Sequence, residues 1–357
     1  MNDPAAAKED SATNAANMGS GGFEREARLA VVLYGGVSLC IYINGVAQEL
    51  LHLVRATAPE RRDTRPGAIA SNREPLITEE KLRGVERVYR ELGRRAGIAL
   101  DFGSVPAADS PIRTRFVVDV LSGTSAGGIN AIFLAKALAN DQALAELRDL
   151  WLNQGEIDVL LNDSGSLAGM RDRLRDRRPP DSLLNGNRMY WHLREALRGL
   201  DVSPQAGSPA ESSLVDELDL FVTATDLCGL PLPIRLADKV VFERRHKNVF
   251  HFLFATSAAT GDRHNDFVPE NNAFLAFAAR CTSSFPVAFE PMMLEDIERA
   301  AAEPEDRSDF DAKLEVWKRF FKDYLRPHIG TGPPIPPRLS RFEKRAFGDG
   351  GYLDNKP

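Results

Sequence analysis

The chain has 357 residues, of which 43% are hydrophobic and 27% are charged, and its formal net charge is -6. This balance is typical of a globular protein with a sizeable core and excludes a largely disordered chain. The negative charge disfavours nucleic-acid binding through a generally basic surface, so we expect no nucleic-acid partner.

The N-terminal region carries no apolar core of a signal peptide. Residues 1–25 are rich in Ala, Asn, Ser and Gly, and we expect a disordered leader there, followed by one domain at 26–357. The apolar run 29–47 contains Gly35 and Gly36, and a buried strand, a glycine turn and a helix explain it better than a membrane span. We therefore expect no transmembrane segment.

Two strand–turn–helix units lie in the first half of the chain. The run 29–34 is apolar without polar alternation, which predicts a fully buried strand, and helical spacing follows over 41–54. The second unit has a strand at 116–121, a small-residue turn at 123–128 and a helix at 129–138, which continues as helix over 141–152. This repeated order predicts an α/β fold with a parallel sheet.

The second half adds an insertion and further elements. An inserted segment near 153–215 contains five arginines between 171 and 178, and the interspersed aspartates favour a solvated loop over a lipid-docking surface. Within it, 187–200 is predicted to form a helix. A strand is predicted at 218–225, a pair of shorter strands at 239–242 and 249–254 around a basic turn, and helices at 274–280 and 309–325.

The turn of the second unit is a GxSxG pentapeptide, Gly123-Thr124-Ser125-Ala126-Gly127. A serine at the apex of a strand-to-helix turn has strained backbone angles, and only glycine-sized residues two positions away leave room for that turn. The hydroxyl then projects from the sheet edge, and the N-terminus of the helix favours developing negative charge. The pattern predicts Ser125 as a nucleophile, with Gly123 and Gly127 forming its elbow.

The base that would serve this nucleophile is sought among carboxylates and histidines. No histidine sits in a small-residue loop late in the chain, whereas Asp349 stands before Gly350 and Gly351, which let the backbone approach the elbow closely. A carboxylate held in hydrogen-bond contact can take the serine proton directly. Partial burial would raise its pKa from about 3.9 and improve it as a base.

Taken together, these motifs resemble the patatin-like phospholipase family, with the look of a bacterial patatin-related subgroup. The family carries a glycine-rich oxyanion loop, then GxSxG, then a late Asp-Gly-Gly, and the chain has these in the same order across residues 28–355. The segments 221–229 and 280–291 look like the family's sheet strand and the loop before its aspartate. The first loop departs from the family's GGGxRG, because Val37, Leu39 and Cys40 replace a glycine, the arginine and the last glycine.

The resemblance implies a three-layer patatin-like fold with a mainly parallel central sheet flanked by helices. It also implies a lipid acyl hydrolase that works through a Ser125–Asp349 dyad and an acyl-enzyme, without cofactor or metal. Backbone N–H groups around Gly35, Gly36, Val37 and Ala126 would form the oxyanion hole. The expected partner is a lipid or another ester at a membrane surface.

Two other interpretations remain open. A Ser-His-Asp esterase of the α/β-hydrolase fold would need His246, His251, His264 or His328 as its base. A degenerate member would only bind lipid or a partner, which the altered first loop allows.

Three further expectations concern the setting of the chain. The three cysteines are far apart and are expected to be reduced, buried thiols, which favours a cytoplasmic protein, with peripheral attachment to the membrane left open. Family members continue past the aspartate, so we expect the C-terminal end to be truncated.

Overall fold

The computed structural model describes residues 25–58, 79–96, 112–154, 157–163, 182–202, 214–256, 263–297, 316–321 and 344–357. The predicted leader therefore lies outside the described residues, except for Arg25. The same holds for the arginine cluster at 171–178 and for most of the helix predicted at 309–325.

The central sheet has six strands in the order β1-β2-β3-β4-β5, with β6 paired to β3 beside this path. The strands are β1 (Arg25–Leu33), β2 (Thr114–Gly123), β3 (Glu217–Arg235), β4 (Val240–Thr256), β5 (Arg263–Asn265) and β6 (Phe347–Asp349). β2 and β3 are parallel, while β3·β4, β3·β6 and β4·β5 are antiparallel. The predicted α/β class, a central sheet with helices packed against it, is confirmed, and the sheet is mixed in direction.

The helices are α2 (Cys40–Thr57), α3 (Glu86–Arg95), α4 (Ala126–Asn140), α5 (Ala145–Gln154), α6 (Ile157–Leu160), α7 (Gly186–Asp201) and α8 (Asn272–Thr282). The single helix expected through 129–152 is two helices. Asp141 breaks it in the left-handed conformation with φ 49°, where its N–H caps the carbonyl of Ala137.

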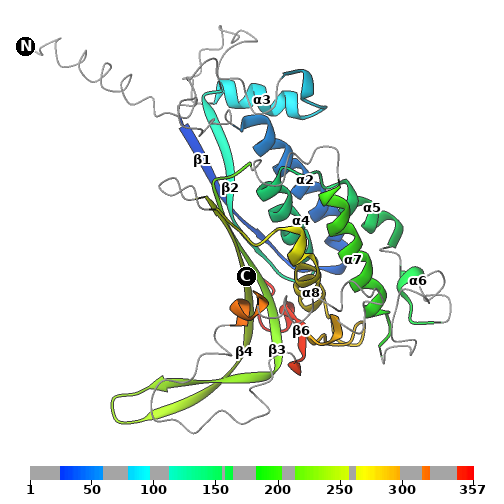
Figure 1. The fold of residues 1–357 in the computed structure, drawn as a ribbon, viewed down its shortest axis with the longest axis vertical. Helices are drawn as coiled ribbons and strands as arrows, with labels where there is room; N and C mark the ends of the chain where they lie inside the picture. The colour runs from blue at the N-terminus through cyan, green and yellow to red at the C-terminus, as the bar shows by residue number, and fades with distance from the viewer. Residues whose placement is uncertain are drawn as a thin grey trace, which may run out of the picture. The chain divides into compact units, whose positions relative to one another are not determined.

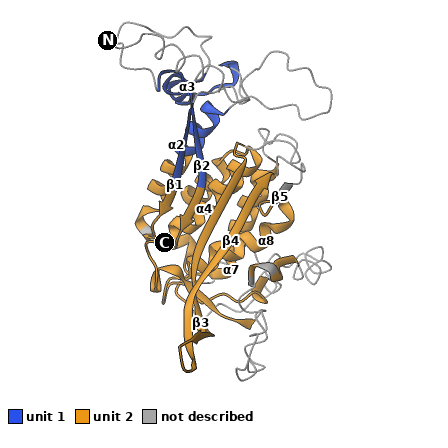
Figure 2. Cartoon of the chain, turned by 90° about the vertical axis from the view of Figure 1, so that its left-hand side faces the viewer, with its two compact units in different colours: residues 1–30, 49–119 blue, residues 31–48, 120–357 orange. Residues whose placement is uncertain are grey.

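Two compact units divide the chain, and Figure 2 colours them separately. The first comprises residues 1–30 and 49–119. Within it, Glu86 of α3 accepts hydrogen bonds from the ring of His52 at 2.8 Å and from the backbone N–H of Arg83 at 3.1 Å. Tyr89 donates to Glu49 at 2.7 Å, so polar contacts join α3 to the second half of α2.

The second unit, residues 31–48 and 120–357, holds the long hairpin of β3 and β4 and the helices α4, α7 and α8. These helices lie on one face of that hairpin (Figure 1). Helix α4 is buried on all sides, as expected for a helix that is mostly apolar around its circumference, and its polar residues Asn130, Lys136 and Asn140 are buried too. Aromatic side chains of β4, α8 and β6 pack together in the core: Phe250, Phe252, Phe274, Phe277 and Phe347.

Two predictions about strands were wrong. In β1 only Leu33 is buried and Val32 is 46% exposed, so this strand is not covered on both faces as its apolar run predicted. The two short strands predicted at 239–242 and 249–254 form one strand of 17 residues, β4, which pairs with β3 on both sides of a register shift.

Candidate active site

Ser125 occupies a strained turn between the end of β2 and the start of α4. Its backbone has φ 52° and ψ -127°, a conformation that costs a non-glycine residue about 1–3 kcal/mol. The turn is held from α8, where the Thr282 hydroxyl accepts a hydrogen bond from the Ser125 N–H at 2.8 Å. Ser125 is half-buried.

Close backbone packing around this turn requires both glycines of the pentapeptide. A Cβ on Gly127 would lie 2.1 Å from the carbonyl oxygen of Leu33, and a Cβ on Gly123 would lie 2.7 Å from the carbonyl oxygen of Gly127. Real Cβ atoms do not approach other atoms so closely, so neither position accepts a side chain without backbone movement. At each position a specific backbone carbonyl thus explains why the pattern requires a glycine.

Asp349 lies at the end of the three-residue strand β6, which pairs with β3 through Ala224. Its N–H donates to the carbonyl of Ser284 at 3.1 Å, and its own carbonyl accepts from the Thr225 hydroxyl at 2.8 Å. The residue is 3% exposed. Its backbone is therefore fixed on both sides, and its carboxylate is buried.

The Ser125 hydroxyl donates a hydrogen bond to Oδ2 of Asp349 at 2.9 Å. The other oxygen, Oδ1, accepts from the N–H of Gly351 at 2.6 Å. A Cβ on Gly350 would lie 2.3 Å from the Thr223 hydroxyl, so this glycine lets the Asp-Gly-Gly segment pack against β3. The structure thus brings together side chains 224 positions apart in the sequence.

Burial raises the pKa of the Asp349 carboxyl above its ordinary value. Three smaller effects oppose this rise: the Gly351 N–H, the Ser125 hydroxyl and the positive charge of Arg280. A carboxylate with a raised pKa is a stronger base than a solvated one, because it binds a proton more tightly.

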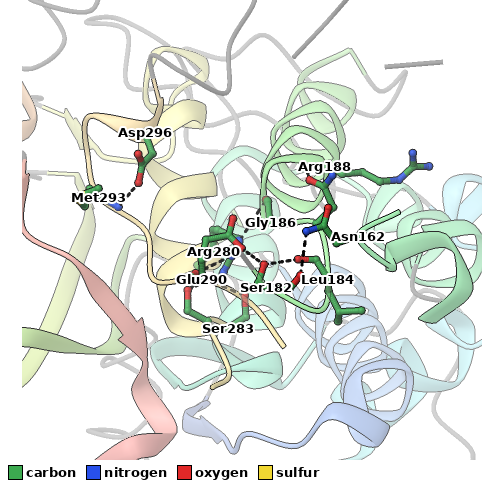
Figure 3. A network of polar contacts seen from close by, with 12 residues as sticks. Asn162, Ser182, Leu184, Gly186, Arg188, Arg280, Ser283, Glu290, Met293 and Asp296 are labelled. Carbon is green, nitrogen blue, oxygen red and sulfur yellow. Dashed lines mark hydrogen bonds and ion pairs between the residues drawn. The ribbon is translucent and has the colours of Figure 1, made fainter. Parts of the chain in front are cut away.

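Arg280 of α8 organises the loop that precedes β6 (Figure 3). It is 1% exposed and donates to the Ser284 hydroxyl at 2.7 Å, to the Glu290 carbonyl at 2.9 Å and to the Gly186 carbonyl at 3.3 Å. The Glu290 carboxylate also accepts a hydrogen bond from the Ser182 hydroxyl. Arg280 therefore fixes Ser284, whose carbonyl in turn holds the N–H of Asp349.

The early glycine pair runs beside Ser125. A Cβ on Gly35 would lie 2.9 Å from the Cβ of Ser125 and 2.2 Å from Oδ1 of Asn355. Gly36 and Val37 follow at the start of a short 3-10 helix, η1 (Val37–Leu39). Ala126 is the first residue of α4, where backbone N–H groups have no partner within the helix.

The histidines of the alternative interpretation have other partners. The ring of His246 contacts the Asp226 carbonyl at 2.8 Å, His264 pairs with Asp266 at 2.9 Å, and His251 pairs with Asp219 at 2.5 Å. Among these three described histidines none hydrogen-bonds to Ser125, and the fourth candidate, His328, lies outside the described residues.

Several residues of the site were not assigned a role from the sequence. They are Arg280 and Thr282 of α8 and Ser284 just after it, together with Thr124 and Thr223, whose hydroxyls share a hydrogen bond of 2.6 Å. The sequence feature that could have pointed to residues 280–284 is the segment 280–291, which resembles a loop of the family. Such a resemblance does not say which atoms the side chains contact.

The cysteines differ in their exposure. Cys281 is buried as predicted, but Cys228 is exposed because it lies in the irregular stretch of β3 where the pairing register shifts. In the part of the chain that the structure describes, no three His, Cys, Asp or Glu side chains gather as metal ligands would. No helix among those residues is both long and apolar enough to cross a membrane.

Comparison with known proteins relates the chain to one family. A family model described as patatin-like phospholipase matches residues 107–357. A Mycobacterium tuberculosis protein named as an uncharacterized membrane protein is 28% identical over 337 residues, which are 93% of this chain and 25% of that protein. The chain thus spans about a quarter of the length of this curated relative, and no solved structure is significantly similar to it. Because the family model covers well over half of the sequence, the chain belongs to the patatin-like phospholipase family.

Proposed function

We propose that the chain is a lipid acyl hydrolase in which Ser125 is the nucleophile and Asp349 is its general base. The observation that carries the proposal is the 2.9 Å hydrogen bond from the Ser125 hydroxyl to Oδ2 of a buried carboxylate. Membership of the patatin-like phospholipase family supports hydrolysis of lipid esters in general.

In the first half of the reaction, Asp349 takes the proton of Ser125 while the serine oxygen attacks the ester carbonyl carbon. The resulting tetrahedral intermediate collapses when the alcohol leaves with the proton held by Asp349, and the acyl group stays on the serine oxygen. In the second half, Asp349 takes a proton from water, which attacks the acyl carbon. The fatty acid leaves, and the proton returns to Ser125.

Backbone N–H groups near Ser125 would stabilise the negative oxygen of both tetrahedral intermediates. The candidates are Gly36, Val37 and Ala126, with Gly35 bringing the loop against the nucleophile. Since these donors belong to the backbone, the family arginine that Leu39 replaces is not needed for this role.

The substrate class follows from the family and is a fatty-acyl ester of a lipid. The relative from Mycobacterium tuberculosis is named as a membrane protein, which supports a substrate at a membrane surface. The headgroup and the chain length of the lipid are for a substrate panel to identify.

The test is labelling with a fluorophosphonate probe, followed by hydrolysis of a short-chain ester and of a lipid panel. We expect the wild type to be labelled and Ser125→Ala to be unlabelled and inactive. Asp349→Asn should lose turnover because its amide cannot accept the serine proton. The matched control is Ser122→Ala, which removes another half-buried serine, three residues upstream on β2, and should leave labelling intact.

Two outcomes would contradict the proposal. A wild type that neither reacts with the probe nor hydrolyses any ester would favour the degenerate, binding-only interpretation. Turnover that survives Asp349→Asn but is lost on replacing His246, His251, His264 or His328 would favour the triad.

A further inference from the structure

The β3–β4 hairpin extends well past the helices of the second unit (Figure 1). Beyond a register shift between Thr225 and Leu230, residues 230–235 pair with residues 240–245, and Leu236 closes the turn by donating to the carbonyl of Lys239 at 2.8 Å. Six residues per strand give this part a length of about 20 Å. Its end lies far from the packed core, and residues 233–240 are exposed.

The end of the hairpin exposes large apolar side chains. Ile234, Leu236, Val240 and Phe242 are each between 40% and 47% exposed, although they lie within nine consecutive positions. Single exposed apolar residues are common on soluble proteins, but a cluster at a projecting tip indicates a contact with another surface.

Cationic side chains surround this apolar tip. Residues 227–247 hold five arginines and lysines against two acidic residues, which is a net charge of +3 in a chain whose total is -6. Arg235 and Lys239 flank the turn, and Arg245 stands at the far end of the paired segment. Within the described residues none of these three forms an ion pair, so their charges are available to an anionic surface.

The root of the hairpin is rigid. Asp226 is fully buried and accepts hydrogen bonds from the N–H groups of Cys228 and Gly229 at 3.0 and 3.1 Å. The buried Arg345 donates to the same carboxylate, with its Nε at 2.9 Å, and to the Gly229 carbonyl at 2.9 Å. These hydrogen bonds hold the hairpin in a fixed orientation relative to the rest of β3.

That strand also borders the proposed catalytic pair. Ala224 of β3 pairs with Asp349, and Asp226 pairs with Phe347, immediately before the irregular stretch where the hairpin turns outward. Binding of the hairpin to a surface would therefore orient the proposed catalytic pair relative to that surface.

We propose that the β3–β4 hairpin docks on an anionic lipid surface, with the apolar tip inserted among the acyl chains and Arg235, Lys239 and Arg245 against the phosphate headgroups. Charge complementarity selects an anionic surface, because the hairpin is positive on a negative protein. An apolar tip with a cationic collar is the pattern of a segment that lies in a membrane interface. The choice of lipid, in place of another protein, rests on the proposed function.

Vesicle co-sedimentation tests the proposal, with Ser125→Ala as the parent protein so that no lipid is consumed. The parent should bind phosphatidylcholine vesicles that contain 30% phosphatidylglycerol more tightly than vesicles of phosphatidylcholine alone. Arg235→Gln with Lys239→Gln should weaken binding to the anionic vesicles about 25-fold, since each cation near such a surface contributes about fivefold. Raised salt should remove this difference.

A second variant tests the apolar tip. Leu236→Ser with Phe242→Ser should weaken binding to both vesicle types, whereas Leu152→Ser, which changes an apolar side chain of α5 that is 55% exposed, should leave binding unchanged. The same hairpin changes in the wild type should leave fluorophosphonate labelling unchanged, which verifies that the site is folded.

The proposal is overturned if the parent ignores anionic vesicles or if the hairpin variants bind them as well as the parent does. It is also overturned if the tip variant alters the oligomeric state in light scattering, because the hairpin then contacts a second copy of the chain. Vesicle binding without any probe reaction would contradict the hydrolase function and leave the docking surface in place.

Discussion

The charge of Arg280 offers a direct test of how the surroundings of Asp349 set its reactivity. Replacing Arg280 with Met keeps much of the side-chain volume and removes the cation whose field lowers the pKa of the Asp349 carboxyl. In the proposed mechanism Asp349 works as a base only when ionised, so activity should fall as the pH drops below its pKa. Without Arg280 this pKa rises, and the acid limb of the pH profile moves to higher pH.

The size of the shift follows from the geometry. An opposite charge in direct contact lowers a carboxyl pKa by about 1–3 units. Arg280 reaches Asp349 through Ser284 and is the smallest of the three opposing effects, so we expect a smaller shift than a cation in direct contact would cause. Tyr352 is the other titratable side chain coupled to Asp349, and it is uncharged over the range of the acid limb.

The assay is kcat/KM on a soluble ester from pH 4 to 9, with Arg345→Met as the matched control. Arg345 is also buried, and its partner Asp226 is fully buried, so losing Arg345 breaks a buried pair at a cost of about 3–5 kcal/mol. The Glu290 partner of Arg280 is 30% exposed, so breaking that pair costs less. Only the Arg280 change should move the acid limb, and Arg280→Lys should keep it near the wild-type position. An unchanged acid limb in folded Arg280→Met, or an equal shift in Arg345→Met, would refute the reasoning.

Three more predictions concern the turn and its base. Gly127→Ala should lower the free energy of unfolding by about 1–3 kcal/mol in denaturant titrations, because its Cβ would meet a β1 carbonyl, whereas Gly45→Ala has open space and should not. Thr282→Val removes the hydroxyl that accepts a hydrogen bond from the Ser125 N–H, so it should lower kcat, whereas Thr282→Ser keeps a hydroxyl and should keep kcat near the wild-type value. Equal kcat values in the two variants would contradict a positioning role for Thr282. Asp349→Asn should raise Tm at pH 7, because the raised pKa of Asp349 in the folded state means that its ionisation favours the unfolded chain. The gain in Tm should shrink in acid, where the carboxyl is protonated in both states. A gain that does not depend on pH would exclude this cause.

The strand, the turn and the helix around Ser125 could be predicted because their signals are local. A short apolar run, two glycines and a helical repeat lie within 25 residues, and each has a direct steric meaning. The partner of Ser125 is not a local property, since 224 positions separate it from Asp349. The family resemblance suggested that pair, and no periodic pattern in the sequence predicts it. The contacts of Arg280 could not be predicted either, because they depend on which carbonyl groups surround a buried side chain.

The hairpin was predicted less well than the turn, for a physical reason. Pro231 and Pro233 interrupt the strand pattern, and the mixture of arginines with valines in β4 reads as a basic turn. In the structure both prolines lie in the paired segment, opposite Arg244 and Phe242. The half-exposed β1 was misjudged because an apolar run does not reveal how fully other elements cover the two faces of a strand.

The distance along the chain between Ser125 and Asp349 has a consequence for biosynthesis. Ribosomes add about 5–20 residues per second, so the serine turn leaves the ribosome some tens of seconds before the aspartate that hydrogen-bonds to it. During that interval the nascent polypeptide carries the proposed nucleophile without its proposed base. Under the proposed function, a newly made molecule can therefore hydrolyse lipid esters only after β6 has been translated and has joined the sheet.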